Sequence, residues 1–290
     1  MPELPEVETT RRGIADLIRG LQIESVEVRR PKLRLPIPED LAIRLEGAQW
    51  QETRRRAKFL LLDSTAGTIL VHLGMSGSLR LTDPTHEYRK HDHIIWHLEG
   101  DRQLRYHDPR RFGIVTWAEV DGEPHSLIGD LGPEPIGGIT TTDLAEHLWQ
   151  SSRGKKKRLR DYLLDGRIIA GIGNIYANEA AWRSGIRPDR ACGRVSRERY
   201  QSLAADLQHV LQVAVEKGGH HAEGFRQSRG RARIFSAYLR GVWTRGGGML
   251  PLWPGNRPGC GFPAFYLLLQ GLPEIANPSS GPLSPVVYKS

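Results

Sequence analysis

The chain has 290 residues, enough to bury a sizeable core in two domains with room for a small third module. It holds no apolar run long enough to span a bilayer, its start is unlike a secretory signal, and its two cysteines, Cys192 and Cys260, cannot form a disulfide framework. The excess of 41 Lys+Arg over 33 Asp+Glu fits either a polyanionic partner or solvated surface charge, and the basic clusters at 54–58 and 153–160 favour the partner. A cytoplasmic enzyme is expected.

The first 120 residues carry the pattern of a β-rich domain. A helix is expected over residues 6–19, and its apolar face would be formed by Val7, Ile14, Leu17 and Ile18. Short alternating stretches between turn residues follow, and their spacing predicts a β-sandwich or barrel. The expected strands are Ile23–Arg29, Phe59–Asp63, Thr68–Leu73, Ser78–Thr82, His93–Leu98 and Gly113–Ala118.

Helical periodicity returns after a break. Residues 121–140 are rich in Gly and Pro and are expected to form a linker. The helices expected in residues 141–219 are Thr142–Gln150, Arg158–Leu164, Asn174–Ser184 and Ser196–Lys217. Residues 220–290 are dense in Gly, Pro and Arg and keep neither period, which is typical of a disordered basic tail.

Pro2 is a candidate nucleophile. Removal of the initiator Met would leave a free secondary amine, and an α-amino group titrates near 7.7–8, so about a tenth or more is unprotonated at neutral pH. Such an amine can attack a sugar C1′, expel the base and form an iminium that permits β-elimination of the phosphate. Glu3 and Glu6 stand where they can move protons. The alternative is an ordinary proline-rich start to a helix.

Five segments, taken together, resemble the formamidopyrimidine-DNA glycosylases. They are Pro-Glu-Leu-Pro-Glu-Val-Glu-Thr at 2–9, Arg-Arg-Ala-Lys-Phe-Leu-Leu at 55–61, His-Leu-Gly-Met-Ser-Gly at 72–77, Asp-Pro-Arg-Arg-Phe-Gly at 108–113, and the stretch 163–179. The resemblance covers about residues 1–219. It implies an α+β fold, with a catalytic β-sandwich flanked by helices over 1–120 and a helix–two-turns–helix DNA-binding domain over 141–219.

The same resemblance implies a bifunctional DNA glycosylase and AP lyase of base excision repair. Such an enzyme excises 8-oxoguanine and formamidopyrimidines from duplex DNA by base flipping, and then cleaves the strand by β,δ-elimination. Pro2 would form the Schiff base and Glu3 would be the acid that assists opening of the deoxyribose. Glu6 would hold the sugar and the catalytic water. Lys58 would bind a phosphate beside the lesion, where an exposed lysine at a strand end is the alternative.

Base flipping leaves a void in the duplex, and the resemblance implies that Met75, Arg110 and Phe112 fill it. An apolar side chain and an aromatic wedge can replace the lost stacking, and a guanidinium can meet the edge of the orphaned cytosine. A lone Met or Phe is more often a core residue. Two charges and a proline in Asp-Pro-Arg-Arg-Phe-Gly nevertheless favour an exposed loop, in which Arg111 would also contact DNA.

Further phosphate contacts are expected in the helical part. Small residues at 171–173 precede a helix start, where free N–H groups can bind a phosphate, and Asn174 would be the N-cap or a direct ligand. Arg160 stands where the family commonly has Lys and would contact phosphate, and Tyr176 would also contact DNA. The histidines His72, His91, His93 and His107 have no metal-site spacing and are expected to be structural.

The tail departs from the family, which ends in a zinc ribbon with two Cys-x-x-Cys pairs. Reading the gene one nucleotide later from about Gly219 makes Met249-Leu250 encode Cys and Trp243-Thr244 encode Gly. Codon degeneracy then permits both Cys pairs at a zinc-site spacing, followed by a stop codon. A shifted frame is therefore expected. As written, the chain lacks the four Cys ligands of the family's structural Zn²⁺, so little zinc and impaired DNA binding are expected.

Two alternatives remain open at this stage. The sister class acts on oxidised pyrimidines and shares the Pro-Glu start, although Leu-Pro-Glu-Val-Glu-Thr and Arg-Arg-Phe favour the purine type. The second alternative is a catalytically weak protein that binds damaged DNA, which the aberrant tail supports. The expected partner is double-stranded DNA with oxidised purines or abasic sites, bound by a monomer associated with the bacterial nucleoid.

Overall fold

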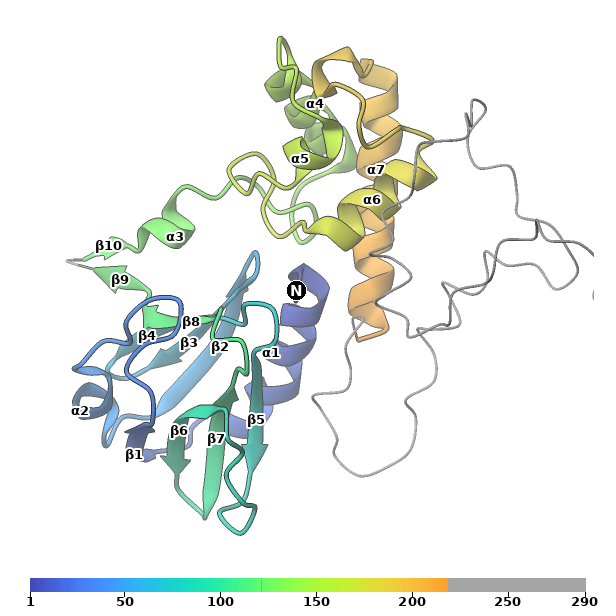
Figure 1. The fold of residues 1–290 in the computed structure, drawn as a ribbon. Helices are drawn as coiled ribbons and strands as arrows, with labels where there is room; N and C mark the ends of the chain where they lie inside the picture. Colours follow the sequence, from blue (N-terminus) through green and yellow to red (C-terminus); the bar gives the residue numbers. More distant parts are fainter. Residues whose placement is uncertain (121, 219–290) are drawn as a thin grey trace, which may run out of the picture. The chain divides into compact units, whose positions relative to one another are not determined.

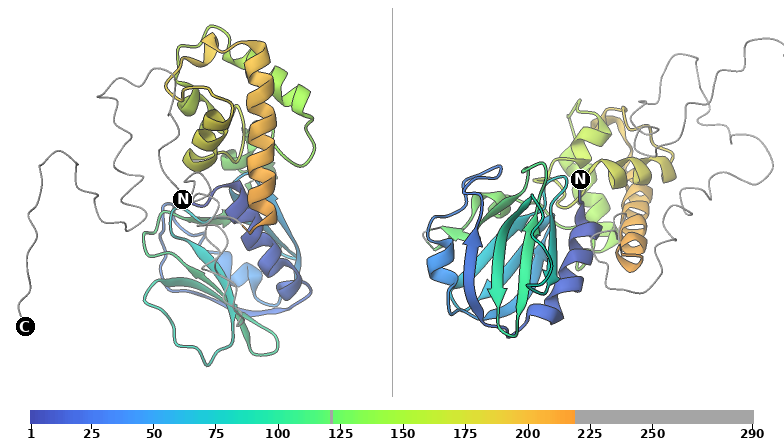
Figure 2. Two further views of the ribbon diagram at one scale, coloured as in Figure 1. Left: turned by 90° about the vertical axis from the view of Figure 1, so that its right-hand side faces the viewer. Right: turned by 60° about the horizontal axis from the view of Figure 1, so that its bottom comes forward.

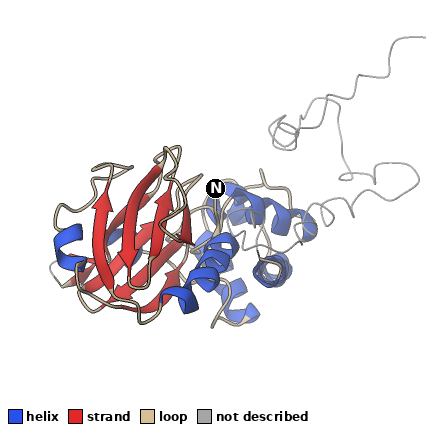
Figure 3. Cartoon of the chain, turned by 90° about the horizontal axis from the view of Figure 1, so that it is seen from below, coloured by secondary structure: helices blue, strands red, loops and turns tan. Residues whose placement is uncertain are grey.

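The computed structural model describes residues 1–120 and 122–218. Residues 220–290, with the expected basic tail and the shifted frame, lie outside the described residues. Strands gather in the N-terminal half of the described chain, and helices make up most of the second half (Figures 1 and 3). This arrangement confirms the expected α+β class.

Two antiparallel four-stranded sheets form the N-terminal half. The first sheet has the order β1-β6-β7-β5 and the second has the order β2-β3-β4-β8. The strands of the first are β1 (Ile23–Val28), β6 (Asp92–Leu98), β7 (Arg102–His107) and β5 (Ser78–Thr82). Those of the second are β2 (Trp50–Arg56), β3 (Phe59–Ser64), β4 (Gly67–His72) and β8 (Ile114–Trp117).

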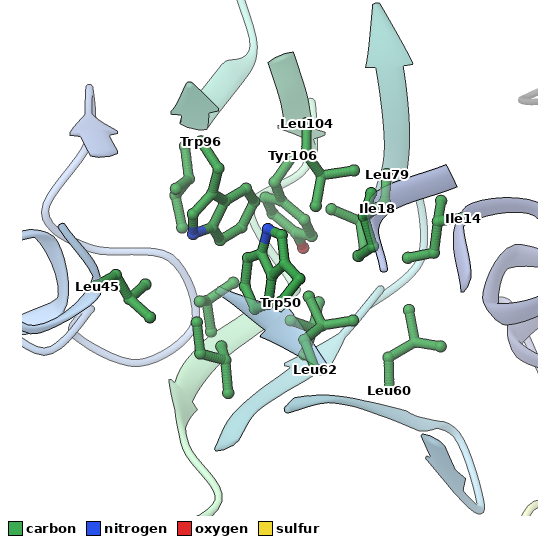
Figure 4. Packing of buried hydrophobic residues seen from close by; sticks show 14 of the residues in the cluster. Ile14, Ile18, Leu45, Trp50, Leu60, Leu62, Leu79, Trp96, Leu104 and Tyr106 are labelled. Carbon is green, nitrogen blue, oxygen red and sulfur yellow. The ribbon is translucent and has the colours of Figure 1, made fainter. Parts of the chain in front are cut away.

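The core of this half lies between the two sheets. Trp50 of β2 and Trp96 of β6 meet edge to face with their ring centroids 6.3 Å apart, so they join one sheet to the other (Figure 4). Alternation along β3 sends Leu60 and Leu62 into this core and Leu61 to the opposite face of the sheet. The expected β-sandwich is therefore confirmed.

The first helix, α1 (Leu4–Ile18), begins earlier than the sequence pattern indicates. Its start is set by Glu3, which is the N-cap and forms a capping box with Glu6, a feature independent of the apolar periodicity. Val7, Ile14 and Ile18 pack into the sandwich core, but Leu17 is 36% exposed. The prediction that Leu17 belongs to the buried face is therefore wrong.

Three elements of this half are not apparent from the sequence. Strand β2 carries a run of charged residues, and β7 contains Arg105, whose charge hides the strand pattern although the residue is 1% exposed. The Arg105 guanidinium donates to Gln103 Oε1 and to the carbonyls of Glu87 and His86, which replaces its lost hydration. The short helix α2 (Leu41–Leu45) completes the set.

The segment expected as a linker has structure of its own. It contains β10 (Glu123–Pro124), which pairs with β9 (Glu119–Val120), and the short helix α3 (Ser126–Gly129). Leu127 and Ile128 of α3 cover Leu61 on the outer face of the second sheet. Beyond α3, the Leu131 and Gly132 carbonyls accept from the Arg56 guanidinium at 2.7 and 2.8 Å. The segment that follows the sandwich is thus hydrogen-bonded to strand β2.

Four helices and a 3₁₀ turn make up the second half. They are α4 (Thr141–Ser152), α5 (Leu159–Leu163), α6 (Asn174–Arg183), the turn Cys192–Arg194 and α7 (Arg197–Glu216). All four helices lie within two residues of their expected bounds. The side chains of Thr140 and Ser196 cap α4 and α7. Helix α1 packs against α7 as well as against the sandwich (Figure 2).

Within residues 1–120 and 122–218, no helix is both long and apolar enough to cross a membrane.

Candidate active site and DNA-binding loops

The carboxylate of Glu3 lies at the N-terminus of α6, although 170 residues separate the two in the chain. Glu3 Oε2 accepts from the Gly173 N–H at 2.8 Å, and Oε1 accepts from the Ile175 N–H at 2.8 Å. The Tyr176 N–H lies 3.4 Å from Oε2. A helix N-terminus stabilises a negative charge through its free N–H groups and its dipole. The start of α1 is therefore fixed to the start of α6.

This contact corrects two expectations about the helix start. The N–H groups at the start of α6 were expected to be free for a phosphate, but those of Gly173 and Ile175 donate to Glu3. The N-cap of α6 is Gly173 and not Asn174. Asn174 is the first helical residue and is exposed. A Cβ at position 173 would lie 2.3 Å from Glu3 Cδ, so glycine is required for the approach of Glu3.

Glu6 is held from two sides beside Glu3. Its Oε2 accepts from the Glu3 N–H at 2.9 Å, and its Oε1 accepts from the Tyr176 hydroxyl at 2.8 Å. Tyr176 is 2% exposed, and its expected contact with DNA stays a prediction. Burial and the Glu6 carboxylate raise the pKa of Tyr176, which keeps its hydroxyl a donor to Glu6.

Lys58 occupies the turn between β2 and β3 and is half-buried. Burial lowers the pKa of Lys58, whereas the charges of Glu3 and Glu6 act in the opposite direction. Burial also raises the pKa of Glu3 above its ordinary value of 4.5, although the Ile175 N–H and the charge of Lys58 oppose that rise. Pro2 precedes Glu3 and is half-buried. The structure thus brings Pro2, Glu3, Glu6 and Lys58 into one site.

Arg55 connects the hairpin that carries Lys58 to two other parts of the chain. Its Nε donates to Glu8 Oε2 of α1 at 3.1 Å, and its Nη1 donates to Glu134 Oε2 at 2.6 Å. Glu134 Oε1 accepts from the Ala57 N–H at 2.7 Å, which supports a turn whose Ala57 has a φ of 54°. No motif or periodicity indicates Glu134, because it lies in the segment expected as a linker.

His72 also belongs beside this site, although its sequence context indicates only a structural role. It pairs with Phe59 across β3 and β4, next to Lys58, and its Nδ1 accepts from the Gly74 N–H at 3.0 Å. Burial, followed by the charge of Lys58, lowers the pKa of His72 to about 4. The ring is therefore neutral at pH 7, and a second positive charge beside Lys58 is avoided.

Met75, Arg110, Arg111 and Phe112 form a second group on two adjoining loops. Met75, in the loop between β4 and β5, is 43% exposed, and Phe112, in the loop between β7 and β8, is 46% exposed. The Arg110 guanidinium lies over the Phe112 ring at 4.8 Å. The expectation of an exposed loop is confirmed for residues 109–112, whereas Asp108 and Gly113 at its ends are buried. Arg160 belongs to neither group, since it lies on α5 and pairs there with Asp161 at 2.9 Å.

Both halves of the chain match models of known domains. Residues 1–115 match the formamidopyrimidine-DNA glycosylase N-terminal domain, and residues 131–225 match the formamidopyrimidine-DNA glycosylase H2TH domain. The formamidopyrimidine-DNA glycosylase of Methylococcus capsulatus is 46% identical over 247 residues, which cover 85% of this chain and 90% of that protein. The enzyme of Syntrophotalea carbinolica is 47% identical over 82% of this chain and 87% of that protein.

Solved structures of the Lactococcus lactis formamidopyrimidine-DNA glycosylase are similar to the described fold. Its complex with DNA containing an AP site superposes with a TM-score of 0.69 at 32% identity, covering 76% of this chain and 84% of that one. Its complex with DNA containing an oxidised pyrimidine gives 0.68 at 32% identity, covering 75% of this chain and 81% of that one.

The opposite pKa shifts of two α1 carboxylates predict opposite pH effects on stability. Because the folded state raises the pKa of Glu3, it binds that proton more tightly than the unfolded chain does. The stabilisation is complete below pH 4.5 and is lost as the pH rises through the folded pKa, at about 1.4 kcal/mol per pH unit between the two pKa values. The free energy of unfolding of Glu3→Gln, relative to that of the wild type, should therefore increase as the pH rises from 4 to 7.

Glu8→Gln is the matched control for this titration. Burial acts to raise the pKa of Glu8, but hydrogen bonds from Arg11, Arg12 and Arg55 outweigh it and lower that pKa to about 2. This stabilisation is present above pH 4.5 and is lost as the pH falls toward 2. The free energy of unfolding of the wild type, relative to that of Glu8→Gln, should therefore increase as the pH rises. Urea unfolding at several pH values measures both slopes, and a common sign for the two variants would contradict the assignment.

Proposed function

The chain belongs to the formamidopyrimidine-DNA glycosylase family, and we propose that Pro2, Glu3, Glu6 and Lys58 carry its base-excision chemistry. Glycosylase and AP lyase activity on damaged DNA is the activity of this family and of this chain. The observation that carries the residue assignment is the position of Glu3. It holds the N-terminal end of the chain against α6, with Pro2 next to it and the charge of Lys58 near enough to affect its pKa.

Pro2 acts as the nucleophile once Met1, which is exposed, has been removed. The Pro2 nitrogen attacks C1′ of the flipped nucleotide as the damaged base leaves with the bonding electrons and a proton. Opening of the sugar ring produces the iminium, whose acidic C2′ proton is removed as the 3′ phosphate leaves. A second elimination then releases the 5′ phosphate.

The neighbouring side chains suit the roles that these steps require. A carboxyl group with a raised pKa is a better proton donor near neutral pH, which fits Glu3 as the acid that opens the ring. Glu6 is fixed by Tyr176 and by the Glu3 N–H, so it can hold the sugar and a water molecule in place. A phosphate beside Lys58 would supply the negative charge that favours its protonated form.

DNA contacts are proposed for the two exposed loops and the helical part. Met75, Arg110 and Phe112 fill the void left by the flipped base, and Arg111 also contacts the DNA. Asn174 and Arg160 contact phosphates from α6 and α5, whereas Tyr176 acts through Glu6. We place the catalytic domain at 1–120 and the DNA-binding domain at 141–219. A monomer acting in the bacterial cytoplasm on nucleoid DNA is part of this proposal.

Borohydride trapping on abasic DNA tests the role of Pro2. Wild type should become covalently attached, whereas a version with an N-terminal extension, which turns the Pro2 nitrogen into an amide, should lose at least about 100-fold in trapping rate. Pro5→Ala, which removes a proline from the first turn of α1 and leaves the terminal amine intact, is the control. Trapping of the extended chain at the wild-type rate would rule out the terminal amine as nucleophile.

Oxidised purines are the proposed lesions. The Lactococcus lactis enzyme has been solved with N7-benzyl-Fapy-dG DNA and with oxidised-pyrimidine DNA, so relatives bind both classes. Base release from duplexes with 8-oxoguanine should be faster than from matched duplexes with thymine glycol. The reverse order would place the chain functionally with the sister class.

The family's structural zinc does not fit the residues of this chain. Only two cysteines are present in the sequence, and the thiol of Cys192 is buried in the helical core, 3.9 Å from the Lys155 carbonyl. In the described part of the chain, no group of three or more His, Cys, Asp or Glu could hold a metal ion. Cys260 lies outside that part. We therefore propose that the chain as written does not form a four-thiolate site.

Metal analysis of the purified chain should find well below one zinc per molecule. Resequencing the gene across codons 215–280 tests the shifted frame that accounts for the missing ligands. One tightly held zinc per chain would contradict this proposal.

A further inference from the structure

We propose that Ser76 is a positioning residue that joins the Met75 loop to the Arg110–Phe112 loop, so that both enter the duplex as one preformed wedge. This inference rests on the proposed function of Met75, Arg110 and Phe112 as void-filling residues. No role was assigned to Ser76 from the sequence.

The Ser76 hydroxyl makes two hydrogen bonds to the neighbouring loop. Its Oγ donates to Asp108 Oδ1 at 2.6 Å and accepts from the Arg110 N–H at 3.2 Å. The first bond is short, within the range of a strong hydrogen bond between a hydroxyl and a carboxyl oxygen. A single side chain next to Met75 therefore contacts both the start of the Asp108 turn and the backbone of Arg110.

Asp108 extends the connection to the far end of its loop. Its carboxylate is fully buried, and Oδ2 accepts from the Gly113 N–H at 2.8 Å. The Asp108 carbonyl accepts from the Arg111 N–H at 3.2 Å and lies 2.8 Å from His93 Nε2. A buried carboxylate needs such donors, and Ser76 provides the one that comes from the other loop.

The two loops also touch through their backbones. Gly74 has a φ of +61°, and a Cβ there would lie 2.5 Å from Gly113 N and from the Phe112 carbonyl carbon. This close approach does not depend on Ser76. Loss of the Ser76 hydroxyl should therefore leave the loops adjacent while removing the bonds that set their relative orientation.

Strain within the Arg110–Phe112 loop makes that orientation costly to maintain. Arg111 has a φ of 56°, a left-handed conformation that is unfavourable for a residue with a Cβ. Such residues persist only where the surroundings hold them. The Ser76 and Asp108 bonds lie on either side of Arg111 and hold this turn, which keeps Arg110 over the Phe112 ring.

A preformed wedge reduces the entropy lost when the loops enter the duplex. Freed loops would have to be ordered during base flipping, and that step would slow. The chemistry at Pro2 should be unaffected, because Glu3 and Glu6 are held by α6 and not by these loops. Loss of the Ser76 hydroxyl should therefore slow base flipping and leave the chemistry at Pro2 unchanged.

Two substrates test the role of Ser76. On duplex DNA with 8-oxoguanine opposite cytosine, Ser76→Ala should lower kcat/KM about tenfold, the effect of losing roughly two net hydrogen bonds. On single-stranded DNA with an abasic site, which leaves no void to fill, borohydride trapping should stay within about twofold of wild type. Ser76→Thr keeps the hydroxyl and should restore the duplex rate. Ser78→Ala, two residues away at the start of β5, is the matched control.

The outcomes separate this inference from the proposed function. Wild-type excision by Ser76→Ala on the duplex would overturn the positioning role, and so would an equal loss on both substrates. Failure of the wild type itself to be trapped on abasic DNA would instead overturn the chemistry assigned to Pro2. Fluorescence of 2-aminopurine beside the lesion reports flipping directly and should rise more slowly with Ser76→Ala than with Ser78→Ala.

Discussion

The bond between the Glu3 carboxylate and the start of α6 is the constraint on which the site depends. A buried carboxylate is tolerated only where donors replace its hydration, and the first turn of α6 supplies them. The same contact brings the N-terminal end of the chain to the helical half. It also leaves Glu3 more readily protonated than a solvated glutamate, since burial outweighs the donors and the charge of Lys58.

Arg55, Glu134 and Tyr176 hold the other charged groups of the site around that contact. Arg55 holds the Lys58 hairpin against Glu8 of α1 and against Glu134, which follows the sandwich in the chain. Tyr176 holds Glu6 from the first turn of α6. Four segments that are distant in sequence therefore fix the relative positions of Glu3, Lys58 and the chain end, and burial strengthens each interaction.

The Met75 loop and the Arg110–Phe112 loop are held in a different way. Met75 and Phe112 are exposed, and the loops are held together beneath them by the buried Asp108 and by the close approach of Gly74 to Phe112. Glu3 and Glu6 are held by α6, and the Lys58 hairpin is held by Arg55. The two loops are held by separate contacts, through Ser76 and Asp108.

The sequence alone determined the fold class, most of the strands and helices, and the exposed loop at 109–112, because periodicity, capping residues and turn chemistry are local properties. It also indicated Pro2, Glu3, Glu6 and Lys58 through short motifs. It did not reveal Arg55, Glu134 or Ser76. It also did not show that the N–H groups of Gly173 and Ile175 bond Glu3 or that the Tyr176 hydroxyl bonds Glu6. Those roles depend on which backbone groups are already occupied by another part of the chain. Only the tertiary structure decides that, because one N–H group at the start of α6 cannot bind both Glu3 and a phosphate.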